Sequence, residues 1–436
     1  MLPPWVATTA LIAALVRPAW SVSYTAASDG NWSATNTWTS SPSTPGTYPD
    51  DSNDTATIGK VINLDVSPTI GGFFTSGATL TNDSGTVRSL TTGTIYYSGG
   101  GASHLRIYTN VVFTITGVGT NNQDNGWIML YGTFNIEPGA TLIHNSTLGF
   151  YALNTVGQGG GTLNTATGGT FRVKKAGILG GGTTGLITFN NEGLIEFNHT
   201  NGTFTVGTKT VTGAGTWRVN DAVAGVVVFA NTATTAVEGW TNSGVFNSLA
   251  TWHVIGSARY IDLPGSNNGM TSIGPDATVI LENGGRILEL NNSARNALTV
   301  NGNLYVRGAN ATNLSFNSAQ SLTVASGGLL GGEGTIVVSG GGQVSVQSGG
   351  TLAVEVDGAT ATKLTVSGGD LVVNGDVNVS NLSAPSATEY LIATAAAITC
   401  TPTKTTGDDN WRPQVRNGNT ELWLVRRSIG TIIQIL

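Results

Sequence analysis

The stretch "GEGTIVVSGGGQVSVQSGGTLAVEVDG", Gly332 to Gly358, shows the pattern on which the whole chain is built. It holds three short apolar segments, Ile336 to Val338, Val344 to Val346 and Leu352 to Val354, separated by glycines. In a strand, alternate side chains point to opposite faces, so each segment supplies one or two side chains to a core. The glycines supply corners, where the backbone bends without a Cβ clash. The stretch therefore predicts stacked short strands that form a wall.

The composition favours stacked β-structure. Of 436 residues, 61 are glycine and only 10% are charged, against roughly 25% in ordinary globular proteins. Uncharged polar residues can pair along β-ladders, and glycine can make the bends between strands. The net charge is −6 and the 19 Lys and Arg are thinly spread, so no nucleic-acid partner is expected. The single cysteine, Cys400, excludes a disulfide within the chain.

Two all-β architectures fit the recurrent short apolar alternations, such as "TFNIEPGATLIHN" at Thr133 to Asn145. A series of β-sandwiches would have longer strands and tight hairpin turns. A parallel β-helix has three very short strands per coil and tolerates corners of variable length. Glycine corners outnumber hairpin signals here, which favours a parallel β-helix. We predict it over residues 61–385, preceded by an N-terminal cap segment at 22–60 and followed by a C-terminal β cap and tail at 386–436.

The N-terminus, residues 1–21, has the pattern of a secretory signal peptide. A short apolar run, Val6 to Val16, is followed by small residues at Ala19 and Ser21. The run is too short to span a bilayer, and no integral membrane span is expected elsewhere in the chain. The alternative is a buried first strand or helix. The leader predicts a secreted protein, extracellular or at the cell surface.

Two segments carry distinctive motifs. The first is "DGNWSATNTWTSSPSTPGTYPDDSNDTATIG", Asp29 to Gly59, with the order Gly-x-Trp, Trp, Pro, Asp-x-Ala-x-Ile. The second runs from Ala325 to Ser380 and carries G-G-x-G-T-I and G-G-x-L units. Both resemble secreted bacterial proteins built from autotransporter-associated β-strand repeats, and the second is similar to the closing repeats of autotransporter passengers. The resemblance implies a secreted or surface-exposed right-handed β-helix. It covers about a third of the chain.

The densest acidic group is Asp50, Asp51 and Asp54, in "DDSND". Its carboxylates are possible Ca²⁺ ligands, because calcium prefers oxygen donors. The group lacks the glycine and terminal glutamate of a calcium loop, and a solvated turn is the alternative interpretation. No other cofactor is predicted.

Tryptophans are the other candidates for binding. Trp217, Trp240 and Trp252 fall in mid-rod coils, where on the outside they could stack on sugar rings and on the inside would fill the core. Trp32 and Trp38 are expected to cover the open end of the rod, since a first coil without a cover presents free strand edges.

The preferred functional hypothesis is a non-enzymatic structural or adhesive β-helix, which could self-assemble into a surface layer, matrix or filament. Polysaccharide lyases and hydrolases on this fold need clustered carboxylates, which are sparse here. The alternative is a carbohydrate-binding or polysaccharide-degrading β-helix, for which Asp221 and Asp276 are the candidate acids. The expected partners are further copies of the chain, cell-surface polysaccharide, or both.

Overall fold

The computed structural model describes most of the chain between residues 21 and 427. The described residues are 21–43, 47–98, 104–121, 128–147, 150–151, 160–175, 177–179, 187–199, 203–206, 210–219, 225–229, 245–246, 251–255, 259–262, 272–275, 278–282, 286–287, 297–316, 321–338 and 340–427. Within them the only helical element is a single 3-10 turn, η1 (Thr35–Thr37). None of the described segments forms a helix that is long and apolar enough to cross a membrane. The leader lies outside these residues.

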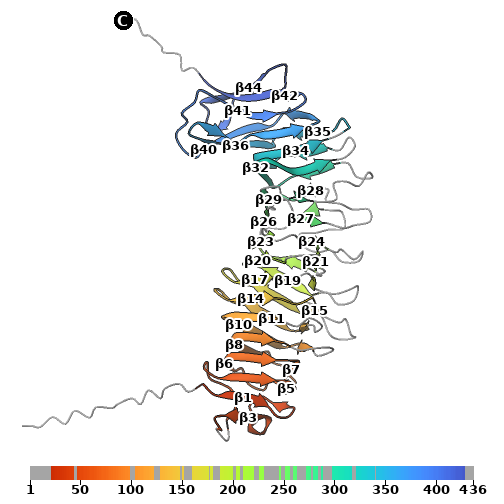
Figure 1. The fold of residues 1–436 in the computed structure, drawn as a ribbon, viewed down its shortest axis with the longest axis vertical. Coiled ribbons are helices and arrows are strands. Elements are labelled where there is room, and N and C mark those ends of the chain that lie inside the picture. Colours follow the sequence, from red (N-terminus) through yellow and green to blue (C-terminus); the bar gives the residue numbers. More distant parts are fainter. Residues whose placement is uncertain are drawn as a thin grey trace, which may run out of the picture.

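The strands stack into a parallel β-helix that forms one long rod (Figure 1). One ladder runs through its whole length, with every neighbouring pair parallel. Its strands are β1 (Ser23–Ala26), β4 (Thr55–Ile58), β6 (Thr69–Thr75), β8 (Arg88–Tyr97), β11 (Val118–Asn121), β14 (Thr141–His144), β17 (Thr170–Val173), β20 (Leu194–Phe197), β23 (Thr216–Val219), β26 (Thr251–Ile255), β29 (Thr278–Glu282), β32 (Asn303–Phe316), β34 (Leu329–Val338), β36 (Thr351–Asp357), β40 (Asp376–Asn381) and β43 (Thr406–Gly407). Strands stack about 4.8 Å apart, so the ladder is roughly 70 Å long.

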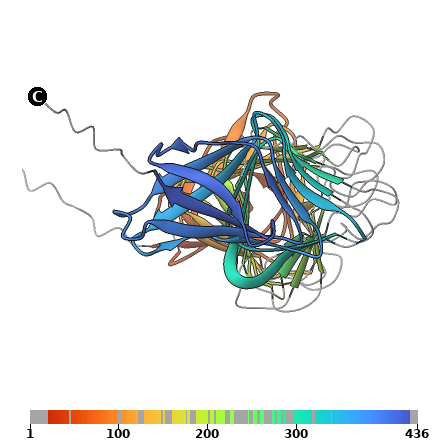
Figure 2. The ribbon, with the colours of Figure 1, turned by 90° about the horizontal axis from the view of Figure 1, so that it is seen from above.

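Shorter parallel ladders form the other faces of the rod, and seen along its axis they surround a shared interior (Figure 2). Two branch from the long ladder: β10 (Val111–Ile115), β13 (Thr133–Ile136), β16 (Thr162–Thr165), β19 (Thr188–Asn191) and β22 (Thr210–Thr212) follow β8, and β38 (Leu364–Ser367) and β41 (Glu389–Thr394) follow β34. A third contains β2 (Gly30–Asn31), β5 (Val61–Asn63), β7 (Ala78–Thr81), β9 (Leu105–Ile107), β12 (Ile128–Leu130) and β15 (Phe150–Tyr151). A fourth contains β18 (Gly177–Leu179), β21 (Thr203–Val206), β24 (Gly225–Phe229), β27 (Arg259–Asp262) and β30 (Arg286–Ile287). The last contains β25 (Val245–Phe246), β28 (Ser272–Ile273), β31 (Ala297–Val300), β33 (Ser321–Val324), β35 (Gln343–Val346), β39 (Asp370–Val373) and β42 (Ile398–Cys400).

Antiparallel strands occur at the two ends of the rod. At the first coil, β3 (Trp38–Ser41) pairs antiparallel with β1. At the other end, β45 (Glu421–Arg426) pairs antiparallel with both β41 and β44 (Trp411–Arg416), and β37 (Thr360–Ala361) turns back on β36. Parallel pairing itself begins with β1 and continues to β43, beyond residues 61–385 on both sides.

The rungs differ in length, which explains the drifting spacing of the sequence repeats. Thr55 pairs with Gly72, 17 residues further on, whereas Thr216 pairs with Thr251, 35 residues further on. The strands keep their register while the corners between them absorb the difference. The parallel pairing excludes the β-sandwich alternative and confirms the predicted β-helix.

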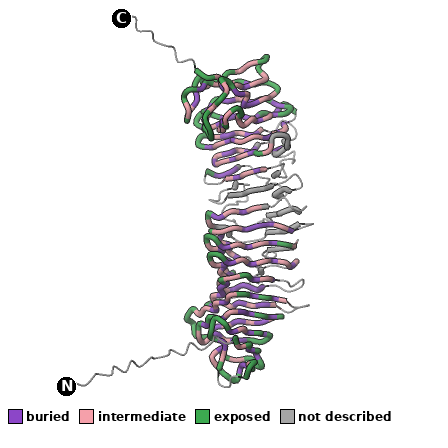
Figure 3. Tube along the Cα trace, turned by 60° about the vertical axis from the view of Figure 1, so that its left-hand side comes forward, coloured by how far each residue is buried: buried purple, intermediate pink, exposed green. Residues whose placement is uncertain are grey.

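Buried and partly buried residues alternate along the strands, which gives the rod a narrow interior (Figure 3). The apolar segments of the stretch at residues 332–358 behave as predicted. The inward residues of its strands are at most 2% exposed: Ile336, Val338, Val344, Val346, Leu352 and Val354. At its corner, Gly349 has φ +80°, and a Cβ on Gly350 would lie 2.8 Å from the carbonyl oxygens of Val324 and Ala325. Both positions require glycine.

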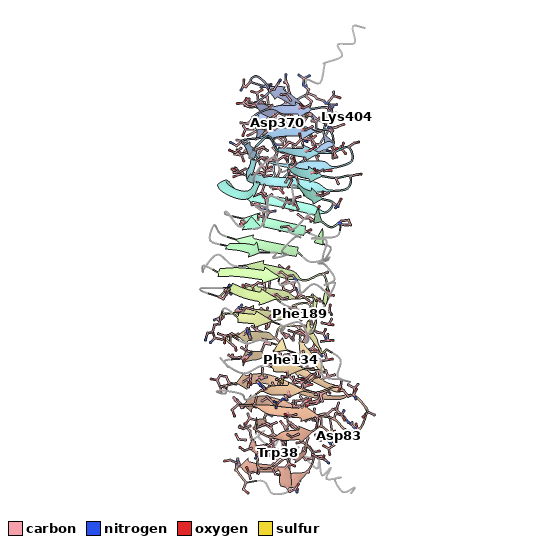
Figure 4. The ribbon with its side chains drawn as sticks, turned by 90° about the vertical axis from the view of Figure 1, so that its right-hand side faces the viewer. Trp38, Asp83, Phe134, Phe189, Asp370 and Lys404 are labelled. Atoms are coloured by element: carbon pink, nitrogen blue, oxygen red, sulfur yellow. The ribbon has the colours of Figure 1, made fainter. Side chains whose placement is uncertain are left out.

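In the N-terminal half, aromatic rings pack against one another in the interior. The ring of Phe113 lies 5.1 Å from the rings of both Phe73 and Phe134. Further along, Phe189 lies 6.0 Å from Phe171. Phe134 and Phe189 lie at different heights along the rod (Figure 4). Phe113 and Phe134 are Cα partners on adjacent rungs, whereas the other two contacts are edge-to-face and join strands that do not pair. The rings therefore link both the rungs and the faces of the rod.

Polar groups also enter this interior. His144 and Asn121 are fully buried on adjacent rungs, and the Asn121 amide lies 3.2 Å from Nδ1 of the His144 imidazole. Burial lowers the pKa of His144 to about 4, because the interior disfavours the charged imidazolium. His144 is therefore neutral in the folded protein at neutral pH.

We predict that this buried imidazole makes the protein less stable in mild acid. Below pH about 6.5 the unfolded chain binds a proton at His144 that the folded chain does not bind until pH about 4. The free energy of unfolding should fall by up to about 1.4 kcal/mol per pH unit across this window. Urea titrations from pH 7 to 4.5 measure it. The slope should be smaller in His144→Gln and largely retained in His104→Gln; equal slopes in the parent and His144→Gln would contradict the account.

Candidate functional site

The predicted acidic group, Asp50, Asp51 and Asp54, is organised around one buried carboxylate. Asp54 is 4% exposed, and its oxygens accept the backbone N–H groups of Val22, Asp50 and Asp51 at 3.4, 3.3 and 3.2 Å. Asp51 accepts two hydrogen bonds from Asn53, at its backbone and its amide. The carboxylates thus hold a turn and tie it to the start of β1.

The three carboxylates are close enough to affect one another. Burial, and then the charges of Asp54 and Asp51, raise the pKa of Asp50. A bound cation would relieve this repulsion, but the oxygens of Asp54 face N–H donors. Among the described residues no group of three or more His, Cys, Asp or Glu is arranged to hold a metal ion. The geometry is that of a structural turn.

The structure describes two of the three tryptophans that were predicted to stack on sugar rings. Trp217 is 1% exposed and packs between Phe189 and Phe197, at ring distances of 5.4 and 6.1 Å. A ring without an exposed face cannot stack on a sugar, so the binding prediction is wrong for Trp217, which is a core residue. Trp252 is the Cα partner of Trp217 on the next rung. Trp240, together with Asp221 and Asp276, lies outside the described residues.

Trp32 and Trp38 lie in the first coil, where they are buried. The indole N–H of Trp32 donates to the carbonyl oxygen of Pro49 at 2.7 Å, and that of Trp38 donates to the carbonyl oxygen of Trp32 at 2.7 Å. Their rings are 4.9 Å apart. The pair fills the end of the apolar interior with its polar atoms satisfied.

Much of the outer surface consists of uncharged side chains that bond to each other from rung to rung. The Asn164 amide donates to the Asn135 side-chain oxygen at 2.8 Å, and the Asn135 amide donates to the Thr114 hydroxyl at 3.4 Å. Near the first coil, Asn63 donates in the same way to Asn31 at 2.9 Å. These rows make a regular surface of amides and hydroxyls.

Two exposed aromatic residues interrupt this polar surface. Phe74 on β6 and Tyr96 on β8 are Cα partners and are 37% and 42% exposed. Thr57 and Thr120 occupy the same register position on the rungs on either side. Val118, 56% exposed, precedes Thr120 by two residues and so lies on the same face. We call these five residues the aromatic surface.

Gly72 determines how the ring of Phe74 lies. A Cβ on Gly72 would be 2.8 Å from Cε2 of Phe74, so the ring lies back across this glycine and covers it. An edge of the ring therefore lies beside Gly72, and 37% of Phe74 remains exposed to solvent. A flat aromatic face beside hydroxyl groups suits a ligand with an apolar face and polar edges, such as a sugar ring.

Sequence reasoning missed the aromatic surface, although the sequence carries a signal for it. Phe73-Phe74 and Tyr96-Tyr97 are aromatic doublets inside strands. Because side chains alternate between faces, one member of each doublet must point outward. Phe73 and Tyr97 are indeed buried at 0% exposure, and Phe74 and Tyr96 are the exposed members.

Comparisons with known proteins give no match: no family model, no curated protein and no solved structure is significantly similar to the chain. They do not support membership of the autotransporter-associated repeat group. The β-helix that this resemblance implied is nevertheless the fold observed.

We predict that the acidic turn acts without calcium. Asp54→Ala removes the acceptor for the three backbone N–H groups, which should cost about 1–3 kcal/mol of unfolding free energy. Asp409→Ala, an exposed acidic control, should change it by less than about 0.5 kcal/mol. Thermal melts with calcium or with a chelator should coincide. A melting temperature that rises with calcium in the parent and not in Asp54→Ala would show a calcium site instead.

Proposed function

We propose that the chain is a non-enzymatic β-helix protein, secreted or held at the cell surface, with a structural and adhesive role. The observation that carries the proposal is the aromatic surface, an exposed apolar pair on the side of a stiff rod whose other described faces are largely uncharged and polar. Soluble proteins seldom leave neighbouring aromatic rings exposed unless they bind something. The signal-like leader supports export.

The geometry favours contacts along the sides of the rod. Antiparallel strands pair along β1 at the first coil and along β41 at the other end, so these two strands present no free edge. Free edges are what joins β-proteins end to end. Sideways association of rods through Phe74 and Tyr96 would build a layer or matrix. The rows of amides and hydroxyls would provide weaker polar contacts beside them.

Carbohydrate binding is the second candidate, and a specific observation favours it. The exposed ring of Phe74 lies beside Gly72, with the exposed Thr57 on the next rung. This combination can stack on a sugar and bond to its hydroxyl groups. Cell-surface polysaccharide is therefore a proposed partner alongside further copies of the chain.

The test is a double substitution, Phe74→Ser with Tyr96→Ser. Both side chains are exposed, so the variant should fold, and loss of an aromatic anchor should weaken self-association or polysaccharide binding roughly tenfold. Light scattering measures the first and retention on a polysaccharide panel the second. The matched control is Leu382→Ser, which removes a side chain that is 64% exposed far along the chain.

Three results would contradict the proposal. The double variant could associate and bind as well as the parent, the control could lose as much as the double variant, or the parent could remain monomeric and bind nothing. Release of reducing ends or unsaturated products from the panel would show that the chain is an enzyme.

A further inference from the structure

A pocket lies at a corner of the rod near its first coils, on a different face from the aromatic surface. Its volume is about 380 Å³, within the range of small-ligand sites. The residues that line it include Asp29, Gly59, Lys60, Thr79, His104 and Arg106. They come from the β1–β2, β4–β5 and β8–β9 connections and from β7 and β9.

The connections near the pocket differ in length. Two residues, 59–60, connect β4 to β5, and two, 76–77, connect β6 to β7. Seven residues, 98–104, connect β8 to β9 on the next rung. Small residues line the short corners, where a Cβ on Gly59 would come no closer than 4.0 Å to any atom outside its neighbours. The space beside Gly59 is therefore open.

The pocket gathers positive charge in a chain that has little of it. Lys60 and Arg106 face it together with His104, against the single carboxylate of Asp29. One oxygen of Asp29 already accepts the Val61 backbone N–H at 2.9 Å. Among the described residues, ion pairs join Arg172 to Glu196 and Arg416 to Glu389, and none includes Lys60 or Arg106. Both cations can therefore bind a ligand.

The two cations are spaced by the ladder itself. Val61, Thr79 and Arg106 are Cα partners on three successive rungs, which puts Arg106 about 10 Å from Val61 along the axis. Lys60 adjoins Val61 at the lower rung. Both side chains line the same pocket, so a single acidic group bound there can contact both cations.

His104 adds a group whose charge can change with pH. Burial, and then the charge of Arg106, lower its pKa, so at neutral pH it is an uncharged partner. Lys60, Arg106 and Asp29 are the charged groups that share the pocket with it. An anion bound there would favour the protonated imidazole, and binding should strengthen as the pH falls.

We propose that this corner pocket binds the oxyanion group of an acidic polysaccharide, a carboxylate or a sulfate held between Lys60 and Arg106. The choice of a polysaccharide as the source rests on the adhesive function proposed above, whereas the preference for an oxyanion rests on the pocket alone. The aromatic surface would add an uncharged contact to the same rod.

Calorimetry on the full chain at low salt tests the proposal with three oligosaccharides of equal length: a uronic acid oligomer, a sulfated oligomer and a neutral one. We expect one or both acidic oligomers to bind more tightly than the neutral one, and more tightly at pH 6 than at pH 8. Arg106→Gln and Lys60→Gln should each weaken binding about tenfold, as expected for a lost charge-assisted hydrogen bond. The matched control is Lys404→Gln, an exposed lysine at the far end of the rod (Figure 4), which should leave affinity unchanged.

Gly59→Leu tests the pocket by shape instead of charge. Its backbone is compatible with other residues and the space beside it is open, so the variant should keep the parent melting temperature and lose acidic-oligomer binding by tenfold or more. Tighter binding of the carboxylate or of the sulfate oligomer identifies which oxyanion the pocket takes.

Equal affinity for the neutral oligomer would overturn the inference. So would no binding of either acidic oligomer, an equal loss in Lys404→Gln, or tighter binding of a single-stranded DNA of equal charge. The double variant Phe74→Ser with Tyr96→Ser tests the adhesive function and leaves this pocket intact. The Lys60, Arg106 and Gly59 variants test the pocket and leave the aromatic surface intact. Failure of the adhesive function and failure of the pocket are therefore measured separately.

Discussion

The structure depends on parallel strands that stack in register. Each inward residue lies above the inward residue of the rung below, so the inward side chains form a column along the rod. The side chains of this column must be apolar, and each must fit against the side chain on the next rung. Phe113 and Phe134, Cα partners whose rings stack 5.1 Å apart, show this constraint most clearly. Where a polar residue enters the column, as at His144, the neighbouring rung supplies its partner, Asn121.

The same constraint leaves the corners free to vary. A corner has to return the chain to the next strand in register, and its length is otherwise unconstrained, as rungs of 17 and 35 residues show. Both candidate binding features depend on what lies outside the column. Phe74 and Tyr96 occupy outward positions of the long ladder, and the pocket of Lys60 and Arg106 lies where short corners meet a longer one.

The sequence predicted the fold because a single stretch carries the repeating rule. The apolar segments at Val344 and Leu352 and the glycines between them encode rung and corner directly. The face of an isolated residue was harder to predict. Trp217 lies between two polar residues, Thr216 and Arg218, and its contacts with Phe189 and Phe197 show that it points inward.

The sites were beyond prediction for a related reason. Asp54 was recognised as part of an acidic group, but its burial depends on the backbone of Val22, 32 residues earlier in the chain. Lys60 and Arg106 meet only because Val61, Thr79 and Arg106 align over unequal rungs. Because the rungs differ in length, the sequence alone does not show which residues of successive coils lie side by side. Residues that share a site are therefore not recognised as neighbours from the sequence.

The register is tested most directly by disulfide trapping in a Cys400→Ser background. Thr141 and Thr170 are Cα partners on β14 and β17, about 4.8 Å apart, which is within disulfide range. Thr141→Cys with Thr170→Cys should form a disulfide in the folded protein under mild oxidation. Thr141→Cys with Arg172→Cys, displaced by two residues and about 8 Å apart, should not. Efficient trapping of the displaced pair, or none of the aligned pair, would contradict the in-register parallel β-helix.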